Sequence, residues 1–104
     1  SAHEREVRIA GGVDVLRRVH KAPGGLLRAT MEVKDGHLVQ VSLSGDFFCY
    51  PQDGVGELEK RLAGTALEEA GEILESFYAA GVQTPGVAIA DWLAVLGAGQ
   101  KSRD

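Results

Sequence analysis

Two runs of alternating apolar and polar residues, separated by a tight turn, constrain the fold of this chain more than any other feature. The apolar members are Leu27, Ala29, Met31 and Val33 in the first run and Val39, Val41 and Leu43 in the second. This alternation is the period of a strand with one buried face. Asp35-Gly36 lies between the runs, and an Asp-Gly pair favours a two-residue hairpin turn because both positions tolerate positive φ. The sequence therefore predicts an antiparallel hairpin over residues 27–44.

Helical patterns follow the hairpin. Apolar residues recur at helical spacing in three segments, residues 51–64, 65–81 and 84–96. A chain that places its strands first and its helices afterwards favours an α+β fold, because the helices can then cover one face of the sheet. We therefore expect a small antiparallel sheet of two to three strands, covered on one face by about three helices.

The predicted helix starts depend on capping residues. Pro51 and Asp53 suit a first helical turn, where an N–H group is not needed and a carboxylate opposes the helix dipole. Thr65 begins a Thr-x-x-Glu capping box, and Thr84-Pro85 has the order of a cap followed by a first-turn proline. These residues predict where each of the three helices begins.

The segment before the hairpin is less regular. Val7–Ala10 alternates apolar and charged residues, which predicts a short strand. Residues 13–19 fit both a helical stripe and an extended segment, and we favour the extended form because Pro23 biases the residue before it toward β. Residues 1–6 and 98–104 are rich in polar residues, so we expect both ends to be flexible.

Length and composition limit the classes of function. The 104 residues fit one domain, residues 1–104, whose core we place over residues 20–96. The net charge is −4 and the basic residues are scattered, which argues against a nucleic-acid surface. No apolar stretch approaches the ~20 residues that a membrane span needs. The single cysteine excludes a disulfide within the chain and suits a reducing cytoplasm, so we expect a cytoplasmic protein.

Two short pieces flank the hairpin and carry the candidate site. His20–Leu26 leads into the first strand and Ser44–Phe48 ends the second, so antiparallel pairing brings both pieces to the same end of the sheet. A lysine, a glycine pair, an aspartate and two phenylalanines are thereby placed where a partner or ligand can meet them. Neighbours on a strand point to opposite faces, so Phe47 and Phe48 cannot both enter one core. We expect one to pack under the helices and the other to meet a different surface.

No complete catalytic set accompanies these pieces. Cys49 is a candidate nucleophile or sulfur acceptor, but it lies in an apolar run, and we favour a small buried hydrophobe. The three histidines lack metal-ligand spacing, and His20 is interpreted as a surface residue or part of a binding surface. Gly24-Gly25 leads into a strand, not a helix, so a plain turn and a partner contact are equal alternatives to a phosphate cradle. We therefore predict no catalytic residue and no metal site.

The two pieces together resemble the C-terminal accessory domain of lipoate–protein ligases. The resemblance depends on Lys21–Leu26, on Gly45–Phe48 about twenty residues later, and on Pro51 with the helices that follow. It covers roughly residues 20–96. Residues 7–19 are longer than the family leads us to expect, and they are either a linker from another domain or an added strand.

The resemblance implies a helper role. Lipoate–protein ligases use ATP and magnesium to activate lipoate as lipoyl-adenylate, and then transfer the lipoyl group to a lysine of an acceptor domain. The large catalytic domain holds the adenylation site, and the accessory domain packs against it, in some organisms as a separate polypeptide that adenylation requires. The family's accessory domain is also similar in fold to iron–sulfur scaffold and sulfur-acceptor proteins. We therefore expect a domain that binds no cofactor itself, with the catalytic domain or subunit as its partner and lipoyl acceptor domains as indirect partners.

The predicted docking surface comprises Lys21, Pro23, Gly24, Gly25, Gly45, Asp46, Phe47 and Phe48. The lysine is expected to neutralise phosphate or carboxylate charge, the glycines to permit close backbone approach, and one phenylalanine to anchor in the partner. Docking would support adenylation by ordering the partner's active-site loops. Two alternatives stay open, namely a sulfur-acceptor or iron–sulfur scaffold-like protein and a protein-interaction module unrelated to lipoate.

Overall fold

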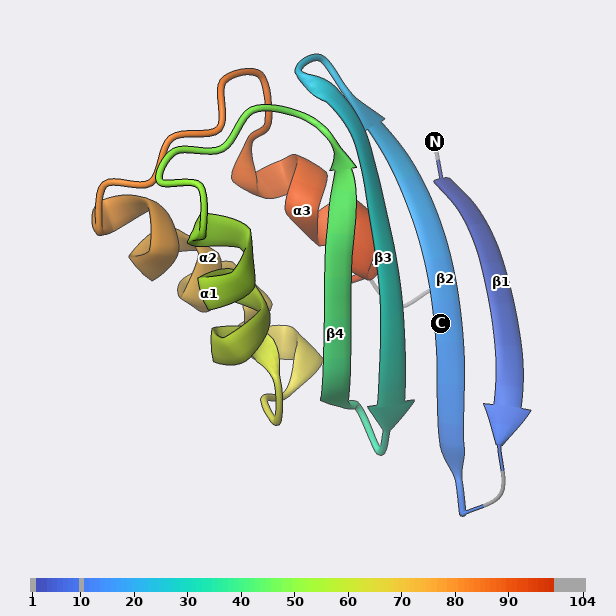
Figure 1. Cartoon of the computed structure of the whole chain (residues 1–104). Helices are drawn as coiled ribbons and strands as arrows, with labels where there is room; N and C mark the ends of the chain where they lie inside the picture. Colours follow the sequence, from blue (N-terminus) through green and yellow to red (C-terminus); the bar gives the residue numbers. More distant parts are fainter. Residues whose placement is uncertain (1, 10, 99–104) are drawn as a thin grey trace.

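A computed structural model of the chain describes residues 2–9 and 11–98, with side chains from Gly11 onward. It has a sheet and a helical layer (Figure 1). The strands are β1 (Ala2–Ile9), β2 (Val13–Ala22), β3 (Gly25–Lys34) and β4 (His37–Asp46), and the helical segments are α1 (Gly54–Leu62), the 3-10 turn η1 (Leu67–Glu69), α2 (Ala70–Ala79) and α3 (Ile89–Leu96). The strands are antiparallel and lie in the order β1-β2-β3-β4, and the helices cover one face. The predicted α+β class is confirmed.

The sheet has one strand more than the two to three expected. Residues 13–19 are extended, as favoured, and β1 pairs with β2 in a continuous register from Ala2 opposite His20 to Ile9 opposite Val13. The backbone of residues 2–6 is paired in β1, and the expected flexibility of residues 1–6 stays a prediction. Residues 1, 10 and 99–104 lie outside the described residues, and the prediction for the C-terminal end falls almost wholly there.

The predicted hairpin is confirmed, with one correction to its register. Asp35 and Gly36 have φ of 52° and 76°, as a tight Asp-Gly turn requires. A bulge between Glu32 and Val33 leaves Val39 as an extra residue on β4. The alternation predicts Val39 on the buried face of the strand. Because of the bulge, Leu38 takes that face and is fully buried, whereas Val39 is 46% exposed.

The core lies between the sheet and the helices. Its largest fully buried side chains are Trp92, Phe77, Leu27, Met31, Leu38, Leu58, Leu62, Leu74, Leu96 and Val95. Burying one such large apolar side chain stabilises the fold by roughly 1.5–3 kcal/mol. The indole N–H of Trp92 donates to the hydroxyl of Tyr78 at 2.7 Å, and that hydroxyl lies 2.6 Å from Thr84 Oγ1. The polar atoms of this buried network are thus satisfied. None of the described helices is long and apolar enough to cross a bilayer.

Two of the three predicted helix starts need correction. Asp53 immediately precedes α1, close to the expected position. The capping box is displaced by one residue, because the Glu69 carboxylate accepts a hydrogen bond from the Ala66 N–H at 3.2 Å while Thr65 donates to the Leu62 carbonyl. The third helix begins at Ile89, not at Thr84-Pro85. The hydroxyl of Thr84 is occupied by Tyr78 and by the Val87 carbonyl, so residues 84–88 form a turn that connects α2 with α3.

Candidate functional site

The two pieces singled out in the sequence meet at one end of the sheet. Lys21 lies opposite Leu26 in the β2–β3 ladder, and Leu26 lies opposite Asp46 in the β3–β4 ladder. These three residues therefore form one row across three strands, with Lys21 and Asp46 both exposed. We call this end, formed by residues 21–26, 43–55 and 84–87, the motif end. It lies at the top of Figure 1.

The glycine pair is accounted for by contacts within the chain. The N–H of Gly24 donates to the carbonyl of Gly86 at 2.8 Å. A Cβ at Gly24 would overlap the Pro85 carbonyl, and a Cβ at Gly25 would overlap the Asp46 carbonyl. The glycines therefore allow the β2–β3 turn to pack against the α2–α3 loop and against the end of β4. The sequence left a plain turn and a partner contact as equal alternatives for Gly24-Gly25. The contacts of the turn account for both glycines.

The two phenylalanines separate as expected. The ring of Phe47 packs edge-on against Trp92, with centroids 5.5 Å apart and an interplanar angle of 85°, so Phe47 belongs to the core margin. Phe48 is 61% exposed. Tyr50 is also 61% exposed, and its backbone is held by two hydrogen bonds with Gln83 of 2.9 and 2.7 Å. Sequence reasoning did not select Tyr50, although Phe48 and Tyr50 are two residues apart in a single apolar run.

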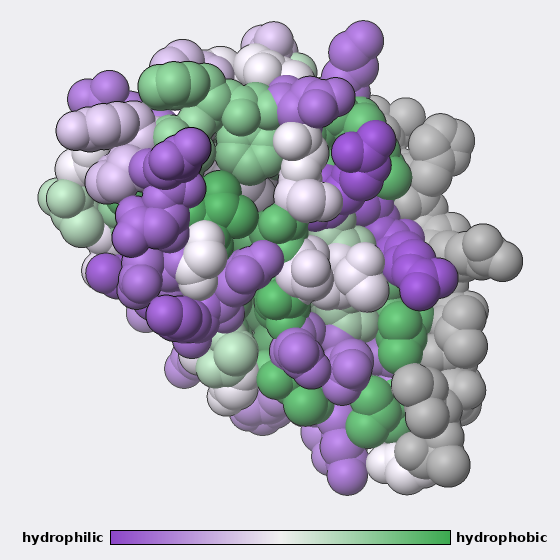
Figure 2. All heavy atoms as spheres, viewed as in Figure 1, coloured by the Kyte–Doolittle hydropathy of each residue, from purple (hydrophilic) through white to green (hydrophobic). Residues whose placement is uncertain are grey.

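An open groove of about 600 Å³ lies between the end of β4 and the start of α1. Its lining residues are Leu43, Ser44, Gly45, Phe47, Phe48, Cys49, Tyr50, Gln52 and Val55, all of them uncharged. Figure 2 shows hydrophobic and hydrophilic residues intermixed at the surface of this upper region. Six of the nine lining residues are apolar or aromatic, so the groove itself is mainly apolar.

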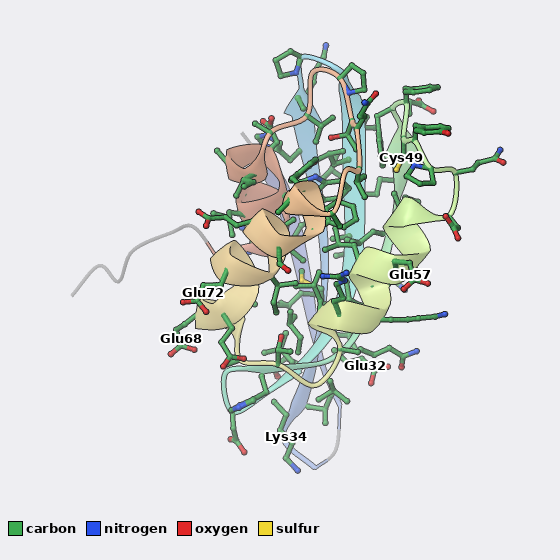
Figure 3. The ribbon with its side chains drawn as sticks, turned by 90° about the vertical axis from the view of Figure 1, so that its left-hand side faces the viewer. Glu32, Lys34, Cys49, Glu57, Glu68 and Glu72 are labelled. Carbon is green, nitrogen blue, oxygen red and sulfur yellow. The ribbon has the colours of Figure 1, made fainter. Side chains whose placement is uncertain are left out.

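Cys49 lies in this groove, at the end of the molecule opposite Lys34 (Figure 3). Its thiol donates a hydrogen bond to the Pro51 carbonyl at 3.4 Å. Burial raises the pKa of the Cys49 thiol, and this effect outweighs the N–H groups of Val55 and Gly54, which lower the pKa. The thiol is thus protonated at neutral pH, which is unfavourable for a nucleophile or sulfur acceptor.

His20 lies on the face of β2 that is turned toward α3. Its ring nitrogen Nε2 lies 2.9 Å from Asp91 Oδ1 on α3, and both side chains are less than a fifth exposed. The interpretation of His20 as a surface residue is therefore wrong. Burial raises the pKa of the Asp91 carboxyl, but the Ala88 N–H at 2.8 Å and the contact with His20 outweigh burial and lower the pKa below its ordinary value. The pair ties β2 to the start of α3.

Two observations concern metal and phosphate binding. Among residues 11–98, whose side chains the structure describes, no group of three or more His, Cys, Asp or Glu residues is placed to hold a metal ion. Gly24-Gly25 leads into β3, not into a helix, and the N–H of Gly24 is already bonded to Gly86, which is unlike a phosphate-binding loop.

Comparison with known proteins gives three matches. A family model described as bacterial lipoate protein ligase C-terminus matches residues 15–83. Lipoate-protein ligase A subunit 2 of Thermoplasma acidophilum is 38% identical over 76 residues, which are 73% of this chain and 81% of that protein. A chain from the solved structure of a bi-partite lipoate protein ligase and its E2 lipoyl domain, from the same organism, has a TM-score of 0.75 and 31% identity. The match covers 90% of this chain and 97% of that chain.

Proposed function

This chain belongs to the family of bacterial lipoate protein ligase C-termini, and we propose that it is the accessory subunit of a two-part lipoate–protein ligase. One observation carries this proposal: the chain matches a chain of a bi-partite ligase over 97% of that chain's length, with the same fold. Residues 1–104 would thus be one accessory domain, working in the cytoplasm, whose partner is the catalytic subunit.

The proposed role is to position the catalytic subunit's active site. The catalytic subunit would bind ATP, magnesium and lipoate, as membership of the lipoate ligase family implies. Lys21, Pro23, Asp46 and Phe48 are exposed at the motif end and are proposed to touch the catalytic subunit. Ordering of that subunit's loops by docking lowers the entropic cost of bringing lipoate and ATP together. Lipoyl acceptor domains, such as the E2 lipoyl domain of the related system, would then receive the lipoyl group.

The remaining residues of the predicted docking surface are proposed to shape it. Gly24, Gly25 and Gly45 each lie against another segment so closely that a Cβ would clash with its backbone. Phe47 packs on Trp92 below the surface. These four residues would thus hold the exposed ones in place.

The test is reconstitution with the cognate catalytic subunit. Lipoyl-adenylate formation is measured with and without this chain, at matched concentrations of ATP and lipoate. We expect the rate to rise by at least about tenfold when the chain is added, as ordering effects of this kind allow. A rate that stays the same in both mixtures rejects the proposal.

The sulfur-acceptor alternative is not favoured, and neither is a module unrelated to lipoate. Both comparisons with individual proteins lead to lipoate–protein ligases. The pKa of the Cys49 thiol is raised by burial, which opposes the activation that a sulfur acceptor needs.

A further inference from the structure

We propose that the groove at the motif end receives an extended segment of the catalytic subunit, which adds to the open part of β4 as a short strand and places an apolar side chain between Phe48 and Tyr50. This inference rests on the proposed function, because it names how the two subunits meet. Main-chain pairing would fix the segment, and the groove would select its side chains.

The first step concerns the outer edge of β4, which other segments cover before Gly45. The Leu38 N–H donates to the Thr65 carbonyl at 2.8 Å, and the Leu38 carbonyl accepts from the Gly64 N–H at 2.5 Å. Further along, the Leu43 N–H donates to Glu59 Oε2 of α1 at 2.7 Å. An edge strand normally invites pairing by other chains; here bonds occupy the edge at Leu38 and Leu43, and Val41 between them is buried.

The second step concerns the continuation of the same edge. In an antiparallel strand the backbone groups of alternate residues point away from the neighbouring strand. The Leu43 N–H points away from β3 toward α1, so the backbone groups of Gly45 also point away from β3. In the part of the chain that the structure describes, no hydrogen bond of another segment reaches Gly45 from that side. The edge is therefore open at Gly45, where Gly45 itself lines the groove.

The third step concerns the size and lining of the groove. Its volume of about 600 Å³ lies within the range of ligand pockets, and it is open enough to take a side chain from a neighbouring segment. Phe48 and Tyr50 are large and exposed; Phe48 follows the packed Phe47, and the backbone of Tyr50 is bonded to Gln83. Aromatic side chains dominate the binding energy of many interfaces.

The fourth step concerns the charge around the groove. Asp46 and Asp53 each directly follow a residue that lines the groove, Gly45 and Gln52. Glu57 in the adjoining hollow lies 3.7 Å from Lys60, so Asp46 and Asp53 are the carboxylates left to face a segment in the groove. Charge complementarity therefore favours a segment in which a lysine or arginine lies beside the apolar anchor.

The experiment uses the full chain and the cognate catalytic subunit, with the dissociation constant measured by titration calorimetry. Phe48→Ala and Tyr50→Ala are each expected to weaken binding by about tenfold or more. Val39→Ala is the matched control, because Val39 is an exposed apolar residue of the same strand at its other end, and we expect less than a twofold change. Phe48 and Tyr50 are exposed, so both variants keep the core, which circular dichroism checks.

Two further measurements test strand addition and charge. Amide hydrogen exchange at Gly45 is expected to slow by about tenfold or more on complex formation, while exchange at Asp35, in the β3–β4 turn, stays unchanged. Asp53→Lys is expected to weaken binding by about threefold, and Glu72→Lys on α2 is the control.

The outcomes separate this inference from the proposed function. Normal stimulation of adenylation with unchanged binding of both aromatic variants, or with unprotected Gly45, overturns the groove proposal and leaves the accessory role intact. A dimer of this chain alone that depends on Phe48 also overturns it, because the occupant would then be a second copy. Failure of the wild-type chain to bind or stimulate the catalytic subunit overturns the proposed function itself.

Discussion

The two ends of the sheet are built from similar local pieces but serve different purposes. The end opposite the motif end, which we call the turn end, comprises residues 11–12, 35–36 and 64–67. Both ends contain glycine turns and a crossing segment from the helical layer, seen at the bottom and the top of Figure 1. At the turn end the crossing segment bonds directly to β4, including Leu67 N–H to the Gly36 carbonyl at 2.9 Å. At the motif end the chain moves away from β4 and leaves a groove.

This difference indicates which end of the sheet can bind a partner protein. At the turn end, residues 64–67 bond to Gly36 and Leu38, and the nearby Val39 is the one large apolar side chain that β4 exposes among the described residues. The motif end exposes Phe48 and Tyr50 beside an open strand edge. Glycines are common to both ends, so their presence does not indicate a binding surface. Exposed apolar surface, which is larger at the motif end, does indicate one.

Replacing one glycine at each end by asparagine is expected to give the largest difference in stability between the two ends. Gly24→Asn is expected to destabilise the fold by about 3 kcal/mol, because its Cβ would overlap the Pro85 carbonyl. Gly36→Asn is expected to cost less than about 1 kcal/mol, because nothing lies within 4 Å and asparagine tolerates the left-handed conformation. Urea unfolding measures both. Equal losses would show that the motif-end glycine is only a turn residue.

The next largest difference is expected in the alkylation rates of a cysteine at each end. Because burial raises the pKa of the Cys49 thiol, its alkylation at pH 7.5 is expected to be about tenfold slower than that of Val39→Cys in a Cys49→Ser background. Addition of the catalytic subunit is expected to slow the reaction of Cys49 further and to leave the reaction at position 39 unchanged. Mass spectrometry follows both rates. Rapid alkylation of Cys49 in the free chain contradicts its burial.

Charge reversal gives a smaller effect. Lys21→Glu is expected to lower the stimulation of lipoyl-adenylate formation by about fivefold, because the lysine is exposed in the row with Asp46. Lys34→Glu at the turn end is the control, and its stimulation should stay within about twofold of wild type. Both are measured with the reconstituted ligase. A larger loss of stimulation for Lys34→Glu than for Lys21→Glu would place the docking surface at the turn end and contradict the proposal.

Acid stability gives the smallest effect. The pKa of Asp91 in the folded chain is lowered from its ordinary value of 3.8, so this carboxylate stabilises the fold above pH 3.8 and loses its contribution as the pH falls through the folded pKa. Asp91→Asn is therefore expected to reduce the loss of stability below about pH 4. Thermal melts between pH 2.5 and 6 measure the difference. Identical acid profiles of Asp91→Asn and wild type would contradict the lowered pKa.

The parts of the fold that depend on neighbours in sequence could be predicted. The hairpin follows from alternation and from Asp35-Gly36, and the separation of Phe47 from Phe48 follows from strand geometry. The placement of Lys21 and Asp46 in one row follows from the pairing of Leu26 with both, once β2 and β4 are each paired with β3. These features need only local backbone preferences and the pairing of adjacent strands.

The parts that depend on distant residues could not be predicted. Thr84 looks like a helix cap, but its hydroxyl is used by Tyr78 of another helix. The packing of Gly24 depends on Gly86, some sixty residues later in the chain. Tyr50 is fixed in its exposed position by Gln83, and a pattern within residues 44–50 carries no information about that contact.

The closure of β4 by residues 64–67 and Glu59 also has a consequence for self-association. Unprotected edges allow identical chains to stack into continuous sheets, which is a route to aggregation. Here the carboxylate of Glu59 stops such growth two residues before Gly45, so an incoming strand finds only a short stretch to hold. Backbone pairing alone would be too weak to retain a foreign chain. Only a segment that also buries a side chain beside Phe48 and Tyr50 would stay bound.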